Sequence, residues 1–323
     1  MRKHHLLFLC VFPFSCTNGE TLKLARPSDP SPSIPLSNNT VSLSGDSRFA
    51  LQPHYTSTRL SATAILMNTI TFLSEAADYG FESYLDINRR ASFSAYPTVM
   101  IDIQTVKAKD RLQNFLLIWA LYEATWDMVA KNNFSVSVFD MVWKGKVVAR
   151  LRYMTPPGSG VEQRIGIGEQ QGGKTVVSPG LAALGGKETL LANVTLSEIE
   201  STNFTSTALL PLNTTTNGVL AMRMQFLRNG RDLPIYTVFM TVMATLVKNA
   251  YYPAKSRIRP FDASTPGFNA QIAISVNTGP GSQQAPFFER DHLNHAIQQL
   301  PSFMLEERTF KEIAFTVMLD NKE

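Results

Sequence analysis

Hydrophobic residues along this chain of 323 residues follow two different spacings. In four long stretches they recur every three or four positions, which is typical of helices with one buried face. In the stretches between, hydrophobic and polar residues alternate, which is typical of strands in a half-buried sheet. The order strand, helix, strand, helix, strand occurs twice. This pattern predicts the α+β class, with two tandem similar β-α-β-α-β(-β) units, each a sheet covered by helices.

The two halves match segment by segment, with spacing shifts of only a few residues. The matching pairs are 48–80 with 221–253 (strand, turn, helix), 98–106 with 269–277 (strand) and 112–131 with 288–307 (second helix). Four elements in one order favour an ancient duplication. The alternative is that two α/β domains merely share a common order of elements.

The match continues after the second helix. "MVAKNNFSVSVFDMVWKGK" starts at Met128 and "MLEERTFKEIAFTVMLDNK" starts at Met304, and both place two phenylalanines five positions apart before a β-rich run. After "WKGK" the first unit continues as "VVARLRY", which predicts the return strand of a hairpin. The second unit stops at its equivalent turn. We therefore expect it to lack its last strand, either by design or because the gene product is incomplete.

Composition divides the chain into five regions. Basic "MRKHH" followed by apolar "LLFLCVFPF" is typical of a secretory signal peptide, and the apolar run is too short to span a bilayer. The alternative for this run is a buried N-terminal strand. The predicted regions are a signal peptide (1–19), a disordered Pro/Ser-rich leader (20–46), the first unit (47–154), a Gly/Ser/Thr-rich glycosylated linker (155–219) and the second unit (220–323).

Removal of the signal peptide changes the chemistry of the chain. Cys10 and Cys16 lie in or beside it, so the mature form would have no thiol and would depend on hydrophobic cores. Its net charge would be about +2, without a basic cluster that contains aromatics, which argues against nucleic acid. N-glycosylation sequons occur at Asn38, Asn133, Asn193, Asn203 and Asn213. These features predict a secreted, extracellular glycoprotein with no integral membrane segment.

Motifs for catalysis or cofactors are weak. "GIGEQQGG" has the spacing G-x-G-x-x-x-G, which does not fit a dinucleotide fingerprint. His292 and His295 are three positions apart near Glu289 and Asp291, and such a pair needs a third converging ligand to hold a metal. Because both histidines lie away from the apolar stripe of their helix, we interpret them as exposed and expect neither metal nor cofactor. Other carboxylates, such as Glu75, Asp78, Glu82, Asp86 and Asp102, are scattered, so catalytic residues stay unknown.

One helix has two apolar faces. Besides the stripe shared by both second helices, the first unit carries Phe115, Trp119, Tyr122 and Trp126 on the opposite side, where the second unit has Asp291, His295, Gln298 and Ser302. A helix that is apolar on both faces is buried on both. Three alternatives remain for what buries the second face: the rest of this chain, a second copy in a homodimer, or a glycan or apolar ligand on an aromatic platform.

Three runs resemble those of secreted proteins from filamentous fungi that are usually described as uncharacterised: "TRLSATAILMNTITFLSEAA", "FLLIWALYEATWDMV" and "VFDMVWKGKVVARL". The resemblance covers the first unit best and implies secretion, but it brings no catalytic motif.

Together these observations favour a non-catalytic extracellular or cell-wall-associated binding or structural protein. The alternative is a secreted hydrolase with carboxylates in a cleft between the units. A hydrolase would bring carboxylates with shifted pKa values together in a pocket. A binding module would show a preformed surface without them.

Overall fold

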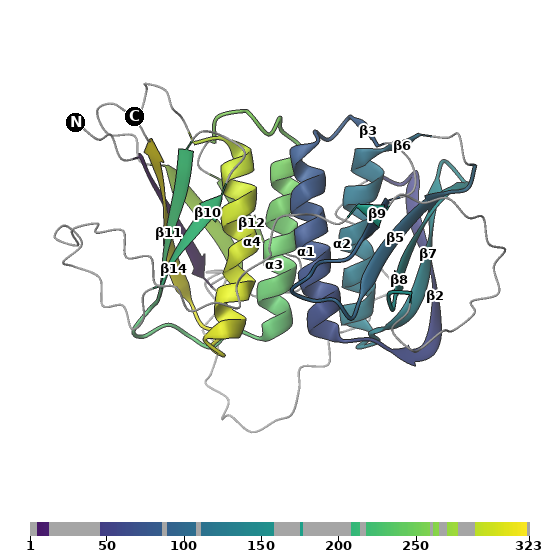
Figure 1. Ribbon diagram of the computed structural model, residues 1–323, viewed down its shortest axis with the longest axis horizontal. Helices are drawn as coiled ribbons and strands as arrows, with labels where there is room; N and C mark the ends of the chain where they lie inside the picture. Colours follow the sequence, from purple (N-terminus) through teal and green to yellow (C-terminus); the bar gives the residue numbers. More distant parts are fainter. Residues whose placement is uncertain are drawn as a thin grey trace, which may run out of the picture.

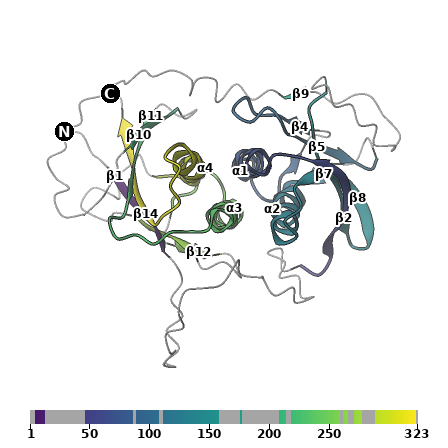
Figure 2. The same ribbon diagram turned by 90° about the horizontal axis from the view of Figure 1, so that it is seen from below.

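A computed structural model describes residues 5–12, 46–85, 89–107, 111–157, 175–176, 208–213, 218–258, 261–264, 270–276 and 288–321. Within these residues, four helices lie between two sheets of mainly antiparallel strands (Figures 1 and 2). This arrangement confirms the predicted α+β class. Nearly all of the predicted leader and most of the predicted linker fall outside the described residues.

The first sheet has the strand order β2-β7-β8-β5-β4-β9, and only the β4–β9 pair is parallel. Its strands are β2 (Phe49–Arg59), β4 (Arg89–Ala91), β5 (Met100–Thr105), β7 (Ser135–Trp143), β8 (Lys146–Met154) and β9 (Thr175–Val176). Two short strands, β3 (Tyr84–Leu85) and β6 (Leu112–Gln113), pair with each other. The turn between β7 and β8 has positive φ at Lys144 and Gly145, as a two-residue hairpin turn requires. This confirms the predicted hairpin.

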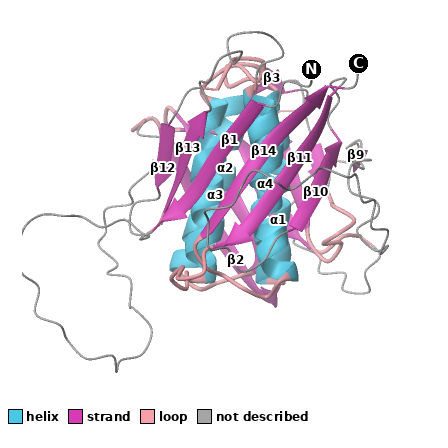
Figure 3. Cartoon of the chain, turned by 90° about the vertical axis from the view of Figure 1, so that its left-hand side faces the viewer, coloured by secondary structure: helices cyan, strands magenta, loops and turns pink. Residues whose placement is uncertain are grey.

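The second sheet has the order β10-β11-β14-β1-β13-β12, with antiparallel neighbours throughout (Figure 3). Its strands are β1 (His5–Phe12), β10 (Ala208–Asn213), β11 (Gly218–Phe226), β12 (Phe261–Ser264), β13 (Gln271–Val276) and β14 (Ile313–Asn321). Strand β1 comes from the segment that the sequence predicts as a signal peptide. Here it forms a strand, which is the alternative considered for that segment, and it occupies the position that the second unit was expected to lack.

The helices form the middle layers of the molecule: α1 (Ala62–Asp78), α2 (Asn114–Ala130), α3 (Ile235–Ala250) and α4 (Arg290–Glu306). Helices α1 and α2 cover the first sheet, and α3 and α4 cover the second (Figure 2). Helix α1 contacts both α3 and α4, and α2 contacts α3. The apolar residues of both sides therefore join in one continuous hydrophobic core.

Both second helices end in the same way, which explains the repeated Met-containing sequence. Asn132 and Arg308 follow α2 and α4 with φ of 48° and 51°. The next backbone N–H then donates back to a methionine carbonyl, from Asn133 to Met128 (2.9 Å) and from Thr309 to Met304 (3.0 Å). These are the backbone bonds of a helix end that closes through a left-handed residue. The chain is thereby turned into β7 and β14.

Candidate functional site

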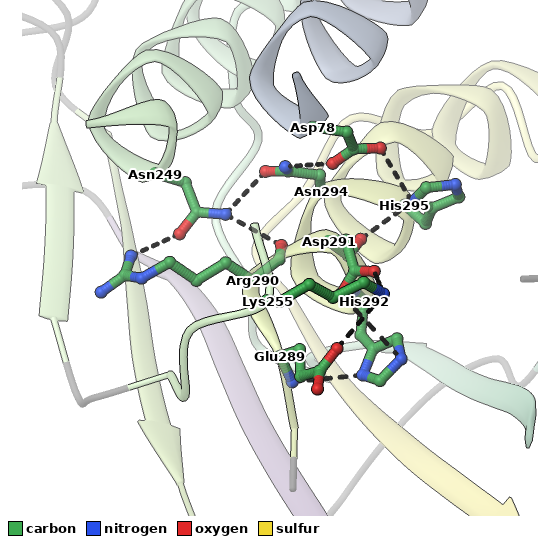
Figure 4. Close-up of polar contacts among 9 residues, drawn as sticks. All are labelled: Asp78, Asn249, Lys255, Glu289, Arg290, Asp291, His292, Asn294 and His295. Carbon is green, nitrogen blue, oxygen red and sulfur yellow. Dashed lines mark hydrogen bonds and ion pairs between the residues drawn. The ribbon is translucent and has the colours of Figure 1, made fainter. Parts of the chain in front are cut away.

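A group of interacting charged side chains gathers around the start of α4 (Figure 4). Lys255, in the turn after α3, places its Nζ 2.5 Å from Oδ2 of Asp291 and 3.3 Å from Oε2 of Glu289. The hydrogen bond that Lys255 donates to Asp291 is the main reason that the pKa of Lys255 is raised. One ammonium group therefore bridges two carboxylates at this helix start.

His292 is buried beside this ion-pair group, which corrects the interpretation of both histidines as exposed. It is only 4% exposed, and its Nδ1 accepts the backbone N–H of Glu289 at 3.2 Å. A side chain at the third helical position that returns to the residue before the helix is part of a capping box. Burial lowers the pKa of His292, against the opposing effect of the Asp291 and Glu289 charges. Because Nδ1 accepts the hydrogen bond from Glu289, the neutral imidazole carries its proton on Nε2.

Glu289, Asp291 and His292 are also the group that could ligate a metal ion, because one atom of each lies within 4.8 Å of the others. Carboxylate oxygen and imidazole nitrogen are suitable ligands for zinc. However, Lys255 bonds to both carboxylates, and Nδ1 of His292 is used by a backbone amide. The arrangement is that of an ion-pair network.

A chain of buried hydrogen bonds links the two halves of the molecule (Figure 4). Arg290 Nη1 donates to Asn249 Oδ1 (2.5 Å), and Asn249 Nδ2 donates to Asn294 Oδ1 (2.6 Å). Asn294 Nδ2 then donates to Asp78 Oδ1 (2.8 Å), at the last residue of α1. Asn249 and Asn294 are each 1% exposed, so each amide depends on these partners. The network ties α3 and α4 to α1.

Asp78 and His295 lie close together at this boundary. Their Oδ2 and Nδ1 atoms are 3.9 Å apart, and the same Nδ1 lies 2.8 Å from the backbone carbonyl of Asp291. A ring nitrogen that contacts a carbonyl oxygen must carry a proton. Burial is the main cause of a raised pKa at Asp78, and the amide of Asn294 acts in the opposite direction. Burial therefore favours the protonated form of Asp78 more than it would be favoured in an exposed carboxyl group.

The aromatic stripe of α2 packs mainly on aromatic rings of its own half and contacts the other half through Trp119. Phe115, Trp119 and Tyr122 are buried, and Trp126 is half-buried. Trp119 packs on Phe115 and, from its Nε1, donates to Tyr251 Oη at the end of α3 (3.1 Å). The rings are covered by protein side chains and leave no open platform on Trp119.

The matching face of α4, which carries His295 and Gln298, contacts α1 of the first half. His295, at the position that matches Trp119, approaches Asp78 at the end of α1. Gln298 Nε2 donates to Thr71 Oγ1, also on α1, at 3.2 Å. Each second helix therefore meets the first helix of the other half, through aromatic groups on one side and through polar groups on the other.

The other predicted residues lie apart from this network. Asn133 is half-buried, and its Oδ1 accepts from Arg59 Nη1 at 3.2 Å. Asn213 ends β10, whereas Asn38, Asn193 and Asn203 lie outside the described residues. Asp102 sits on the first sheet between Arg90 (3.1 Å) and Arg152 (3.6 Å), and burial raises its pKa.

Among the remaining carboxylates, Glu82 is exposed and Glu75 is half-buried, while Asp86 lies outside the described residues. The Asn249–Asn294 link was not foreseen from the sequence. The only signal for it was two asparagines within apolar helical stretches.

Comparison of the chain with protein-family models, with curated proteins and with solved structures gives no match. Of the helices in the described part of the chain, none combines the length and apolar character needed to cross a bilayer.

Proposed function

We propose that this chain is a non-catalytic binding or structural protein made of two similar α+β units that pack through their helices. The observation that carries the proposal is that the charged side chains at and near the boundary are paired with other side chains of the protein. Lys255 engages Asp291 and Glu289, and Asn294 engages Asp78. The Asn294–Asp78 bond holds the two halves together, and Lys255 occupies the carboxylates at the start of α4, whereas a hydrolytic site needs a carboxylate that is directed at a substrate.

The two-unit part of the proposal is supported by strand order. Strands β2-β7-β8-β5-β4 and β11-β14-β1-β13-β12 occupy corresponding places relative to the helices. Two further features support it. The second helices end alike at Asn132 and Arg308, and the contacts His295–Asp78 and Trp119–Tyr251 match between the halves.

An extracellular, N-glycosylated protein remains our proposal for location, and it rests on the N-terminal sequence and the sequons. A glycan or apolar ligand, or a second copy, would have to bind elsewhere than on the stripe of α2, because Trp119 is enclosed by its own chain. Enzymatic release of N-glycans from protein made in a fungal host, followed by intact mass measurement, tests this part directly.

A secreted hydrolase is the second candidate, and one specific observation favours it. Asp78 has a raised pKa and lies beside His295 at the boundary of the two units. A carboxylic acid of this kind can act as a general acid. This candidate requires a second carboxylate across a substrate site.

The test compares the wild type with Asp78→Asn on a panel of fungal cell-wall glycans, with release of reducing ends as the readout. The exposed Glu82→Gln serves as the matched control. Our proposal expects no turnover by any of the three proteins, and binding to an immobilised glycan, if observed, unchanged in Asp78→Asn. Turnover by the wild type and Glu82→Gln that falls about 100-fold or more in Asp78→Asn would establish the hydrolase instead.

A further inference from the structure

Strand β1 lies between two strands that come from much later in the chain (Figure 3). On one side Leu7 and Leu9 are register partners of Val276 and Ile274 in β13. On the other side the same two residues are register partners of Val317 and Phe315 in β14. Each neighbour forms six such register pairs with β1, so the strand is bonded along nearly its whole length on both edges.

The other edges of the two strands that flank β1 are already paired. The far edge of β14 pairs with β11, and the far edge of β13 pairs with β12. Without β1, the sheet would be divided into two parts, each with an unpaired inner edge. Exposed strand edges readily pair with another strand because their N–H and C=O groups lack partners.

Without β1, buried core residues of β13 and β14 would also lose their cover. Phe315 and Val317 in β14 and Ile272 in β13 are each 1% exposed or less. Their register partners in β1 are Leu9, Leu7 and Val11. Apolar residues of β1 thus stand opposite these three buried residues, as a strand at this place requires.

The equivalent position in the first sheet shows how unusual this connection is. There β8 lies between β7 and β5, and a two-residue turn joins it directly to β7. Strand β1 has no such turn to either neighbour and reaches its place from the other end of the described chain.

We propose that the gap between β13 and β14 is a strand-binding site whose occupant is His5–Phe12 of this chain. The folded protein accordingly keeps this segment. The inference depends on sheet order alone. It removes the N-terminal support for the extracellular proposal and leaves the support from the sequons. It opposes the predicted removal of residues 1–19, because signal cleavage would empty the site.

The first experiment compares the full chain with a chain that starts at residue 20, both produced without export. The probe is a fluorescent peptide of residues 5–12 with terminal lysines for solubility. We expect saturable one-to-one binding to the shortened chain and none to the full chain, whose site is filled. A peptide with Leu9→Pro loses a central N–H and should bind about tenfold more weakly or worse. A shortened chain that is as stable as the full chain and binds neither peptide overturns the inference.

A second measurement serves if the shortened chain fails to fold. Cys10 is the register partner of Ala314 in β14. In a full-length Cys16→Ser background, Ala314→Cys should therefore form a disulfide with Cys10 under mild oxidation, because paired strands bring Cα atoms within disulfide range. Ala149→Cys, on the first sheet, is the matched control and should stay reduced. Equal, slow oxidation of both variants overturns the inference.

Intact mass of the protein secreted by a fungal host separates this inference from the proposed function. A stable, glycosylated protein that lacks residues 5–12 overturns the strand assignment and leaves the extracellular proposal standing. A protein that keeps them supports the strand assignment whichever class of function is found.

Discussion

At the scale of single residues, the ends of α2 and α4 offer a matched pair of substitutions. Arg308 has φ of 51°, a conformation that strains most side chains, whereas Asn132 in the equivalent place is of a type that tolerates it. Arg308→Gly should therefore stabilise the protein by up to about 1 kcal/mol. Asn132→Gly should gain less. Urea unfolding of both variants checks the order, and an equal effect at the two sites would contradict it.

His292 makes stability depend on pH. Burial holds its folded pKa below the ordinary value of 6.5, so the unfolded chain binds a proton more readily. Its contribution to stability is present above about pH 6.5 and is lost as pH falls through the folded pKa. Groups near it that also carry charge are Asp291, Glu289, Lys255 and His295.

The variant His292→Gln isolates this effect, because a glutamine at this position can still accept the Glu289 N–H but does not titrate. We expect the free energy of unfolding of the variant to fall less steeply between pH 6.5 and 5 than that of the wild type. Parallel curves, measured by urea unfolding across that range, would assign the pH dependence to other groups.

Asp78 gives stability the opposite pH dependence to that of His292. Its folded pKa is above the ordinary 3.8, so its contribution is full below that value and is lost as pH rises through the folded pKa. Asp78→Asn keeps an oxygen for Asn294 and removes the buried charge. We expect a higher unfolding temperature than that of the wild type at pH 7 and no difference near pH 3.5. A lower unfolding temperature at pH 7 would show that the charges of His295 and Lys255 outweigh burial.

At the scale of elements, α2 is the helix whose loss of packing should cost most. Trp119 is 7% exposed, packs on four aromatic rings and donates to Tyr251. Trp119→Ala should reduce stability by about 3–5 kcal/mol. Tyr251→Phe removes only the hydroxyl and should cost about 1 kcal/mol. Denaturant unfolding gives both values, and a loss below 1 kcal/mol for Trp119→Ala would mean that the aromatic cluster is easily replaced.

Periodicity was a good guide to elements whose own residues determine them. The second helices were predicted at 112–131 and 288–307 and occur at Asn114–Ala130 and Arg290–Glu306, because strong apolar stripes dominate there. Periodicity could not predict contacts between residues that are far apart in the sequence. Asn294 and Asp78 are separated by 216 positions, and neither has a local sequence feature that specifies the other. His292 was misjudged because its ring bonds to the backbone of Glu289 and packs against Phe288, and neither contact follows from the helix stripe.

At the scale of the whole molecule, the two halves should unfold together. Their apolar residues form one core, and the hydrogen bonds from Arg290 through Asn249 and Asn294 to Asp78 cross the boundary. Calorimetry should therefore show a single transition whose calorimetric and van't Hoff enthalpies agree. Two separate peaks would mean that the helix layers contact each other without sharing stability.

The position of β1 has a consequence for the order of folding. The first sheet from β2 to β8 draws on a continuous stretch, Phe49 to Met154, and can assemble as soon as that stretch has been synthesised. Strand β1 is synthesised earlier still, but its partners in β13 and β14 are complete only with Val276 and Leu319. Pairings between distant segments form slowly because a long loop must first be closed. The earliest strand is thus the last to be paired, and the closure of the second sheet becomes the slow step of folding.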